Sequence, residues 1–253
     1  MSFPPLRTQI LGVGVASLLV AFASTSSAAA PLRSHQVPVP RLNSATFEVV
    51  GSYPSIGVPS DDDELRSLIL NDESSFANEL NHDSNHPLIS PAPPPQFRVS
   101  STRGNLSATS RLFSDLIPTF LQPIGGAGEE GWVSIIAEVP SGRLLSLPAL
   151  FSSASRGLQA VAHEARRSVV QDSPCVASSL RSAARSLWNS GFAPTPGNYR
   201  YAALTPSGLA IGFMQGQIAG DACGAPEVEI PYAALSSYWN AEGRRLISGA
   251  SIG

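Results

Sequence analysis

Short strand-like segments separated by proline and glycine limit most strongly what this chain can fold into. The sequence has 22 prolines and 21 glycines among its 253 residues, which restricts the length of regular elements. Residues 45–53 alternate between apolar and polar side chains, and residues 132–139 are β-branched and aromatic, so both predict strands. Amphipathic helical patterns at 152–170 and 173–191 lie between such segments, with Ser173 as the expected cap of the second helix and Pro174 as its first residue. Strands interrupted by helices predict an α+β fold with antiparallel sheets, packed helices and two small domains.

Shifts in composition along the chain predict its division into segments. A proline-rich stretch at 87–95 predicts an extended loop inside the first domain. The last helix is expected at 232–239, after a short strand. The expected segments are a signal peptide at 1–28, a linker at 29–44, an N-terminal α+β domain at 45–140, a C-terminal domain at 141–240 and a tail at 241–253.

The first thirty residues have the layout of a secretory signal. Arg7 is the only charge, an apolar run follows from Ile10 to Phe22, and small residues precede the expected cleavage after Ala28 or Ala29. The apolar run is too short to span roughly 30 Å of hydrocarbon at about 1.5 Å per residue. A cleaved signal is therefore favoured over an uncleaved signal anchor, and we expect a secreted, extracellular or cell-wall-associated protein that is free of the membrane after cleavage.

The cysteine content predicts a disulfide. The chain has two cysteines, Cys175 and Cys223, and a secreted chain with an even number of cysteines is expected to pair them. Closing a loop of roughly 50 residues would destabilise the unfolded state by about 4 kcal/mol. The alternative is a nucleophilic thiol with a histidine base, which an oxidising compartment disfavours.

The charged residues argue against a nucleic-acid partner. The formal net charge is −3, only 14% of residues are charged, and all 16 basic residues are arginine. Binding to a phosphate backbone requires a clustered basic patch, which this composition lacks. The absence of lysine is typical of a GC-rich genome, such as that of an actinobacterium.

Three polar motifs could bind ligands, but each has a simpler structural interpretation. The acidic run at 60–64 precedes a helical pattern that places Leu65, Ile69 and Phe76 on one face. It would stabilise the N-terminus of this helix, and it lacks the alternating ligands of a calcium loop. His82 and His86 have a zinc-compatible spacing but lie among turn-forming residues without a third ligand nearby. The glycines at 125–128 lack the strand–helix context of a phosphate-binding loop. We therefore expect no metal and no cofactor.

Two groups of segments resemble a known family. The first group is 207–213, 222–224 and 227–235, where a hairpin strand is followed by a short strand ending in Ile-Pro-Tyr. The second group is 133–135 and 141–151, which hold a strand, a turn and a hydrophobic corner ending in Leu150-Phe151. Together they resemble the C-terminal domain of RsiV-like extracellular proteins, and the chain is similar in character to secreted mycobacterial immunogenic antigens and their cell-wall homologues.

The resemblance implies a binding role. RsiV is a membrane anti-sigma factor whose extracellular part binds lysozyme, so the implied partner is a host or envelope protein such as lysozyme. Other relatives are implied to be polysaccharide deacetylases or weak esterases, but the separate deacetylase domain is absent from this sequence. The run at 215–223 replaces an aromatic segment common in the family, which puts in doubt any ligand contact made through those aromatics.

Catalytic residues cannot be assigned from the sequence. The G-x-S-x-G match at 249–253 lacks the following helix that a nucleophile elbow needs. His163 and Glu164 lie on the polar side of a predicted helix, where a solvated face is the ordinary interpretation. We therefore expect a monomeric protein- or ligand-binding module without robust catalysis, with a cell-wall esterase of low activity as the alternative.

Overall fold

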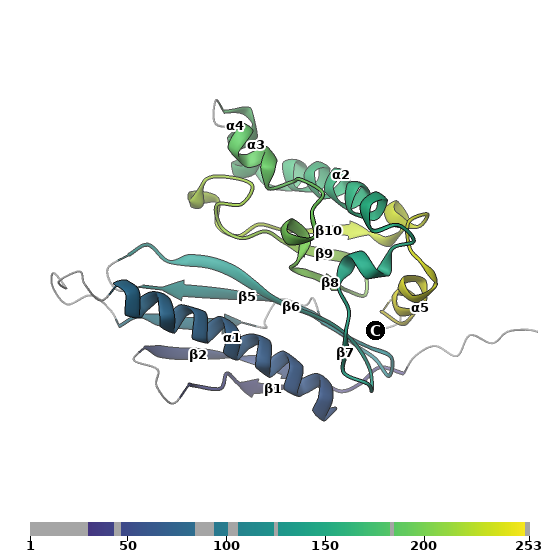
Figure 1. Cartoon of the computed structure of the whole chain (residues 1–253), viewed down its shortest axis with the longest axis horizontal. Coiled ribbons are helices and arrows are strands. Elements are labelled where there is room, and N and C mark those ends of the chain that lie inside the picture. The colour runs from purple at the N-terminus through teal and green to yellow at the C-terminus, as the bar shows by residue number, and fades with distance from the viewer. Residues whose placement is uncertain are drawn as a thin grey trace, which may run out of the picture.

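The chain has an α+β fold that contains two sheets, one of seven strands and one of three (Figure 1). The computed structural model describes residues 30–42, 47–83, 94–100, 106–123, 126–182 and 185–250. Within these ranges, no helix combines the length and apolar character that crossing a bilayer requires. The expected signal peptide at 1–28 and most of the proline-rich loop at 87–95 lie outside the described residues.

The larger sheet is built from the first half of the chain. Its order is β1-β2-β3-β5-β6-β7, with β4 paired to β5, and every pair is antiparallel except β2 and β3. The strands are β1 (His35–Pro38), β2 (Glu48–Ser55), β3 (Gln96–Ser100), β4 (Ser107–Ala108), β5 (Leu112–Gln122), β6 (Glu129–Glu138) and β7 (Arg143–Leu144). The long β5–β6 pairing forms its centre, because both strands carry apolar side chains on both faces.

Helix α1 (Pro59–Asp83) covers one face of this sheet. Its buried side chains Leu65, Ile69 and Phe76 share a core with odd-numbered residues of β5 and β6, such as Ile117 and Ile135. The helical spacing of these apolar residues is the one that the sequence predicts. Helix α1 therefore lies along the sheet, as Figure 1 shows.

The opposite face of the larger sheet packs on the smaller one. Leu116 and Trp132 meet Ala203 and Ala210 in a shared apolar cluster. The Trp132 indole N–H donates to the Phe213 carbonyl at 3.1 Å. The smaller sheet has the order β10-β9-β8, all antiparallel, from β8 (Ala202–Leu204), β9 (Gly208–Gly212) and β10 (Glu227–Pro231).

The remaining helices lie in the second half of the chain. Helix α2 has buried residues Leu158, Val161, Ala165 and Val169, which share a core with the apolar residues of β9 and β10. In Figure 1 this helix lies above the three-stranded sheet. The α-helices are α2 (Ala154–Asp172), α3 (Pro174–Arg181), α4 (Arg185–Ser190) and α5 (Ala241–Ala250), and the 3-10 turns are η1 (Leu147–Leu150), η2 (Pro196–Tyr199), η3 (Asp221–Cys223) and η4 (Tyr232–Leu235).

The structure differs from the sequence expectation at several elements. Residues expected as a linker include β1, which pairs with β2. The helix expected at 173–191 is divided into α3 and α4, because the Ser182 amide donates to the Ser179 carbonyl and ends α3. The expected capping of α3 is present, since the Ser173 hydroxyl accepts from the Val176 amide at 3.4 Å and Pro174 is the first helical residue.

The last helix lies later in the chain than the sequence predicts. Residues 232–239 form only the short turn η4, and the expected tail at 241–253 contains α5. The Asn240 side chain accepts from the Gly243 amide at 2.8 Å, which caps α5, and Leu246 and Ala250 are buried. The tail prediction missed this cap because no long apolar stripe follows it in the sequence.

Candidate functional site

The two cysteines form the disulfide expected from the sequence. Cys175 lies in the first turn of α3 and Cys223 ends η3, with their Cα atoms 5.7 Å apart. The bond ties the helical layer to the loop between β9 and β10. A nucleophilic role for either sulfur is therefore excluded in this oxidised state.

His163 lies on the exposed side of α2, as the sequence predicts. Its side chain is 76% exposed, and its Nδ1 is 3.1 Å from Glu164 Oε1. Glu164 also pairs with Arg167. Among the described residues, no serine hydroxyl forms a hydrogen bond with His163.

The acidic run at 60–64 stabilises a turn and the start of α1. Asp62 Oδ1 accepts from the Ile56 amide at 2.9 Å, and its Oδ2 accepts from the Gly57 amide at 3.0 Å. Asp61 is buried, and this burial raises its pKa. Within the described residues, no group of three or more potential metal ligands gathers here or elsewhere.

The other candidate motifs cannot be placed in full. The side chains of His82 and His86 and the glycine loop at Gly125 lie outside the described residues. The serine-containing motif at 249–253 begins at the end of α5, and its Ser251 also lies outside them.

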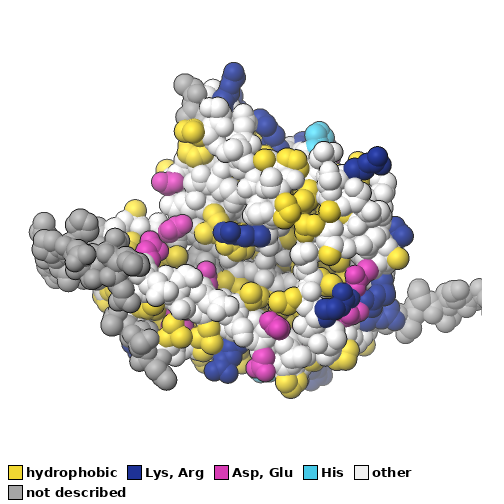
Figure 2. All heavy atoms as spheres, in the orientation of Figure 1, with side chains coloured by type: hydrophobic (Ala, Val, Ile, Leu, Met, Phe, Trp, Pro, Cys, Tyr) yellow, Lys and Arg dark blue, Asp and Glu magenta, His cyan; other side chains and the backbone are white. Residues whose placement is uncertain are grey.

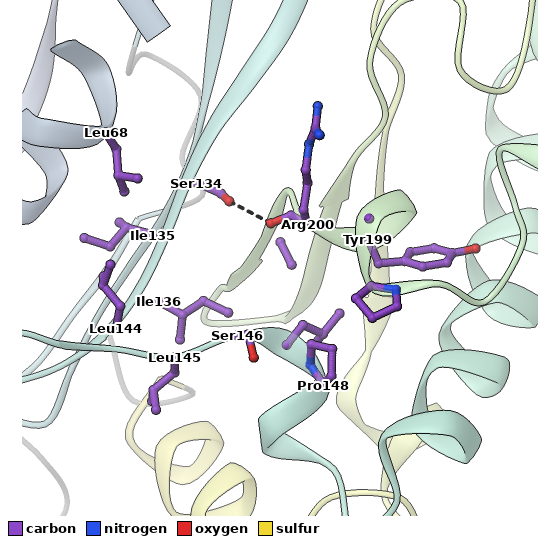
Figure 3. Close-up of a pocket in the computed structure, with 14 residues that line it drawn as sticks. Leu68, Ser134, Ile135, Ile136, Leu144, Leu145, Ser146, Pro148, Tyr199 and Arg200 are labelled. Atoms are coloured by element: carbon purple, nitrogen blue, oxygen red, sulfur yellow. Dashed lines mark hydrogen bonds between the residues drawn. The ribbon is translucent and has the colours of Figure 1, made fainter. Parts of the chain in front are cut away.

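A cleft lies between the two halves of the molecule. Its volume is about 590 Å³. It opens beside β6 and is bordered by α1, by the segment from β7 to η1 and by η2 (Figure 3). The lining is mainly apolar, with Ser134, Ser146 and Arg200 as its polar side chains: Leu68, Ser134, Ile135, Ile136, Leu144, Leu145, Ser146, Leu147, Pro148, Pro196, Gly197, Tyr199, Arg200 and Ala202.

One wall of the cleft is held firmly by the core of the second half. Tyr199 is fully buried, its hydroxyl donates to the Phe192 carbonyl at 2.9 Å, and burial raises its pKa. The Ser134 hydroxyl donates to the Arg200 carbonyl at 3.2 Å and so joins β6 to this wall (Figure 3). The Arg200 guanidinium lies 4.6 Å from the centre of the Tyr201 ring. These contacts preorganise the cleft.

The cleft has an acidic end. Burial raises the pKa of Asp72 to about 6, against the opposing effect of Arg200 and with a further increase from Glu129. Burial also raises the pKa of Glu129, and nearby Glu79 and Asp221 raise it further. We call these four carboxyl groups, those of Asp72, Glu79, Glu129 and Asp221, the acidic end of the cleft. Figure 2 shows Asp and Glu side chains gathered at one end of the hollow between the two halves.

Sequence reasoning did not select the cleft or its acidic end. The residues come from α1, β6, η2 and η3, which are far apart in the chain. Each of them separately resembles an ordinary surface acid or a core residue. The only local signal was the polar side of the helix that contains Asp72 and Glu79.

The second half of the chain matches a known domain. Residues 149–233 match the sequence model of DUF3298, which is described only as a protein of unknown function. The matched region includes α2, the three-stranded sheet and the disulfide. No protein with a curated description matches the chain.

Two solved structures show that the fold extends beyond this domain. A DUF3298 family protein from Pseudomonas aeruginosa PAO1 has a TM-score of 0.51 at 15% sequence identity, with 83% of this chain and 95% of that chain covered. A member of the same family from Bacteroides fragilis NCTC 9343 has a TM-score of 0.53 at 14% identity, with 88% and 99% covered. At these identities the likeness shows the fold alone. The match at 149–233 confirms a DUF3298 domain in the region of the resemblance, and the RsiV-like assignment stays a prediction.

Proposed function

We propose that the protein is a secreted, RsiV-like binding module that holds a protein partner in the cleft between its two halves. The observation that carries this proposal is the preorganised cleft of about 590 Å³, which combines an apolar lining with a few polar groups. Binding sites in proteins commonly have this composition. The module acts as a monomer, outside the cell or at the cell envelope.

The charge of the protein supports a basic partner. Removal of Arg7 with the signal leaves 15 arginines against 19 acidic residues. The acidic end places several of these carboxyl groups beside the cleft. A basic host or envelope protein such as lysozyme is the partner that this arrangement favours.

The disulfide supports the proposed location. Disulfides persist in oxidising compartments and are uncommon in the cytosol. Immunoblotting of culture medium, cell wall and cytosol from the producing organism tests this. Finding the protein with its N-terminus intact and only in the cytosol would contradict secretion.

Binding to lysozyme tests the partner and the cleft together. Leu144 lines the cleft and Leu187 lies on α4, and both side chains are exposed, at 45% and 65%. We expect Leu144→Glu to weaken binding at least tenfold in calorimetry, while the matched control Leu187→Glu binds like the natural protein. Equal effects of the two substitutions would contradict binding in the cleft. A failure to bind lysozyme or any envelope protein would contradict the proposed class of partner.

The same protein preparations test the esterase alternative. Hydrolysis of short p-nitrophenyl esters that a serine-directed inhibitor abolishes would favour a cell-wall esterase. Hydrolysis that resists the inhibitor would be incidental and would leave the binding proposal unchanged.

A further inference from the structure

A second pocket lies between α2 and the segment that contains η4. Its volume is about 450 Å³, and it shares no lining residue with the cleft. One side belongs to α2, and the other belongs to η4 and the residues that follow it. Most of its lining side chains are polar: Arg156, Gln159, Ala160, His163, Glu164, Ala234 and Tyr238. The pocket is therefore suited to a polar ligand.

Three of these polar side chains have no partner in the protein. Within the described residues, the side chains of Arg156, Gln159 and Tyr238 form no hydrogen bond or ion pair. Arg156 and Gln159 are exposed, whereas the Tyr238 ring is partly buried against the core of the second half. This packing fixes the Tyr238 ring at the wall of the pocket. All three groups can donate hydrogen bonds to a ligand.

His163 supplies a fourth polar group with a free atom. Its Nδ1 lies 3.1 Å from Glu164 Oε1, and this contact orients the imidazole ring and leaves Nε2 available to a ligand. Glu164 also pairs with Arg167, which offsets its negative charge. A protonated His163 would therefore add a positive charge and a donor at Nε2.

The layer around this pocket is basic, although the whole protein is acidic. Residues 154–190, which include α2, α3 and α4, contain five arginines and two acidic residues. Figure 2 shows basic side chains along the upper part of the molecule, where Figure 1 places these three helices. The first turn of α2 also contains no acidic residue, so its helix dipole adds to the positive potential. The local charge thus favours an anionic ligand.

We propose that this pocket binds the phosphate or carboxylate group of an anionic sugar. Arg156 would pair with the anionic group, because a guanidinium forms strong charge-assisted hydrogen bonds to oxyanions. Gln159 and Tyr238 can both donate to and accept from sugar hydroxyl groups. A volume of about 450 Å³ exceeds what a bare oxyanion occupies, so a larger molecule that carries the anion fits the space. This site is independent of the partner proposed for the cleft.

Titration with inorganic phosphate, glucuronic acid and glucose tests the class of ligand. The NMR signals of the His163 and Tyr238 rings report occupation of the pocket. We expect saturable shifts with the anions, with dissociation constants in the millimolar range, and none with glucose. A response to phosphate alone would identify a phosphorylated ligand, and a response to glucuronic acid alone a carboxylated one. No saturable shift with either anion, or an equal shift with glucose, would overturn the proposal.

A pair of arginine substitutions separates the pocket from general surface charge. Arg156→Gln and Arg185→Gln each remove one exposed arginine from the same helical layer, but only Arg156 lines the pocket. We expect Arg156→Gln to raise the dissociation constant of the bound anion at least tenfold, through loss of a charge-assisted hydrogen bond. Arg185→Gln should change it less than twofold. Equal losses would indicate non-specific attraction and overturn the pocket.

Substitution of the neutral groups tests whether they contact the ligand. Tyr238→Phe keeps the ring that packs on the core, and Gln159→Ala lies at an exposed position, so both variants should fold. Each should weaken binding of the anion roughly threefold, because one hydrogen bond is lost. Tyr201→Phe is the matched control, since Tyr201 does not line the pocket. Unchanged affinity in both Tyr238→Phe and Gln159→Ala would reduce the site to a surface arginine and overturn the proposal.

Discussion

The half of the molecule built on α1 and the larger sheet buries ionisable side chains, whereas the half built on α2 and the smaller sheet buries apolar side chains and is cross-linked. Asp61, Glu73 and Asp115 are all at most 2% exposed and all belong to the first half. In the second half, Thr205 is the buried polar residue among those described. Burial raises the pKa of each of the three acids, and that of Asp115 reaches about 7.

Because of this difference, the stability of the first half should depend on pH more strongly than that of the second half. Buried carboxyl groups oppose folding when they ionise, so the stability of the first half depends on pH. The disulfide and stacked rings such as Phe151 and Trp239, whose centroids are 4.7 Å apart, hold the second half independently of pH over the neutral range. The cleft lies between the first half and the wall formed by the second.

Removing the disulfide should change the stability of the protein more than any of the other substitutions below. We expect Cys175→Ser with Cys223→Ser to lower the free energy of unfolding by about 4 kcal/mol, because the unfolded chain regains the freedom of a loop of roughly 50 residues. Urea denaturation followed by Trp fluorescence measures this. The natural protein in reducing buffer should match the double variant, and an unchanged midpoint would show that the disulfide does not stabilise the second half.

Neutralising Asp115 should remove much of the pH dependence of the first half. Its pKa rises from 3.8 to about 7 through burial, so the folded state holds a proton that the unfolded state loses, and stability falls as pH rises across this range. At pH 8, Asp115→Asn should therefore be more stable than the natural protein by roughly 2–3 kcal/mol, with a smaller difference near pH 4.

Thermal denaturation across this pH range measures the effect. Asp63→Asn, at an exposed position of α1, is the control and should follow the natural protein. A difference between Asp115→Asn and the natural protein that stays constant with pH would contradict a buried titrating carboxyl group.

The contact between the two halves can be weakened at a single hydroxyl. The Leu204 amide of β8 donates to the fully buried Ser114 hydroxyl of β5 at 2.8 Å. Ser114→Ala leaves this amide without its acceptor and should cost about 1–2 kcal/mol of unfolding free energy. Ser75→Ala, whose hydroxyl lies on the exposed side of α1, should change stability by less than about 0.5 kcal/mol; equal losses would show that the hydroxyl does not couple the sheets.

The surface ion pairs should have the smallest effect, with the opposite pH dependence. Hydrogen bonds from Arg245 and Arg143 lower the pKa of Glu138, which links the end of β6 to α5 and β7. Their stabilisation is therefore present above the ordinary pKa range of a glutamate and is lost as pH falls below it. Glu138→Gln should cost under about 1 kcal/mol at pH 7, and the cost should shrink in 1 M NaCl during thermal denaturation. A cost that is independent of salt would contradict a surface electrostatic origin.

The sequence predicted the parts of the fold that depend on local patterns. The apolar spacing of Leu65, Ile69 and Phe76 indicated α1, and Ser173 with Pro174 indicated the start of α3. The errors fell where local patterns are weak, as at α5, whose packing depends on contact with η1 and β5. The division into two domains at 140/141 stays a prediction, although β7 beyond this point pairs with β6.

The candidate site was less accessible to sequence reasoning. His163, the most conspicuous polar side chain of α2, lies on an exposed surface, while Ser134 and Glu129 have no distinctive sequence context. Their importance comes from the neighbours that the fold gives them. A cleft forms only where distant segments leave space between them, and the sequence of β6 contains no information about this.

By itself, the sequence determined the mixed α+β pattern, the helix caps and the pairing of Cys175 with Cys223, because periodicity and capping act over a few residues and two cysteines allow one intramolecular pairing. The tertiary structure decided the sheet order, the cleft and the raised pKa values of Asp72 and Asp115. Each of these properties depends on desolvation or contact between residues from distant segments, which local patterns do not specify.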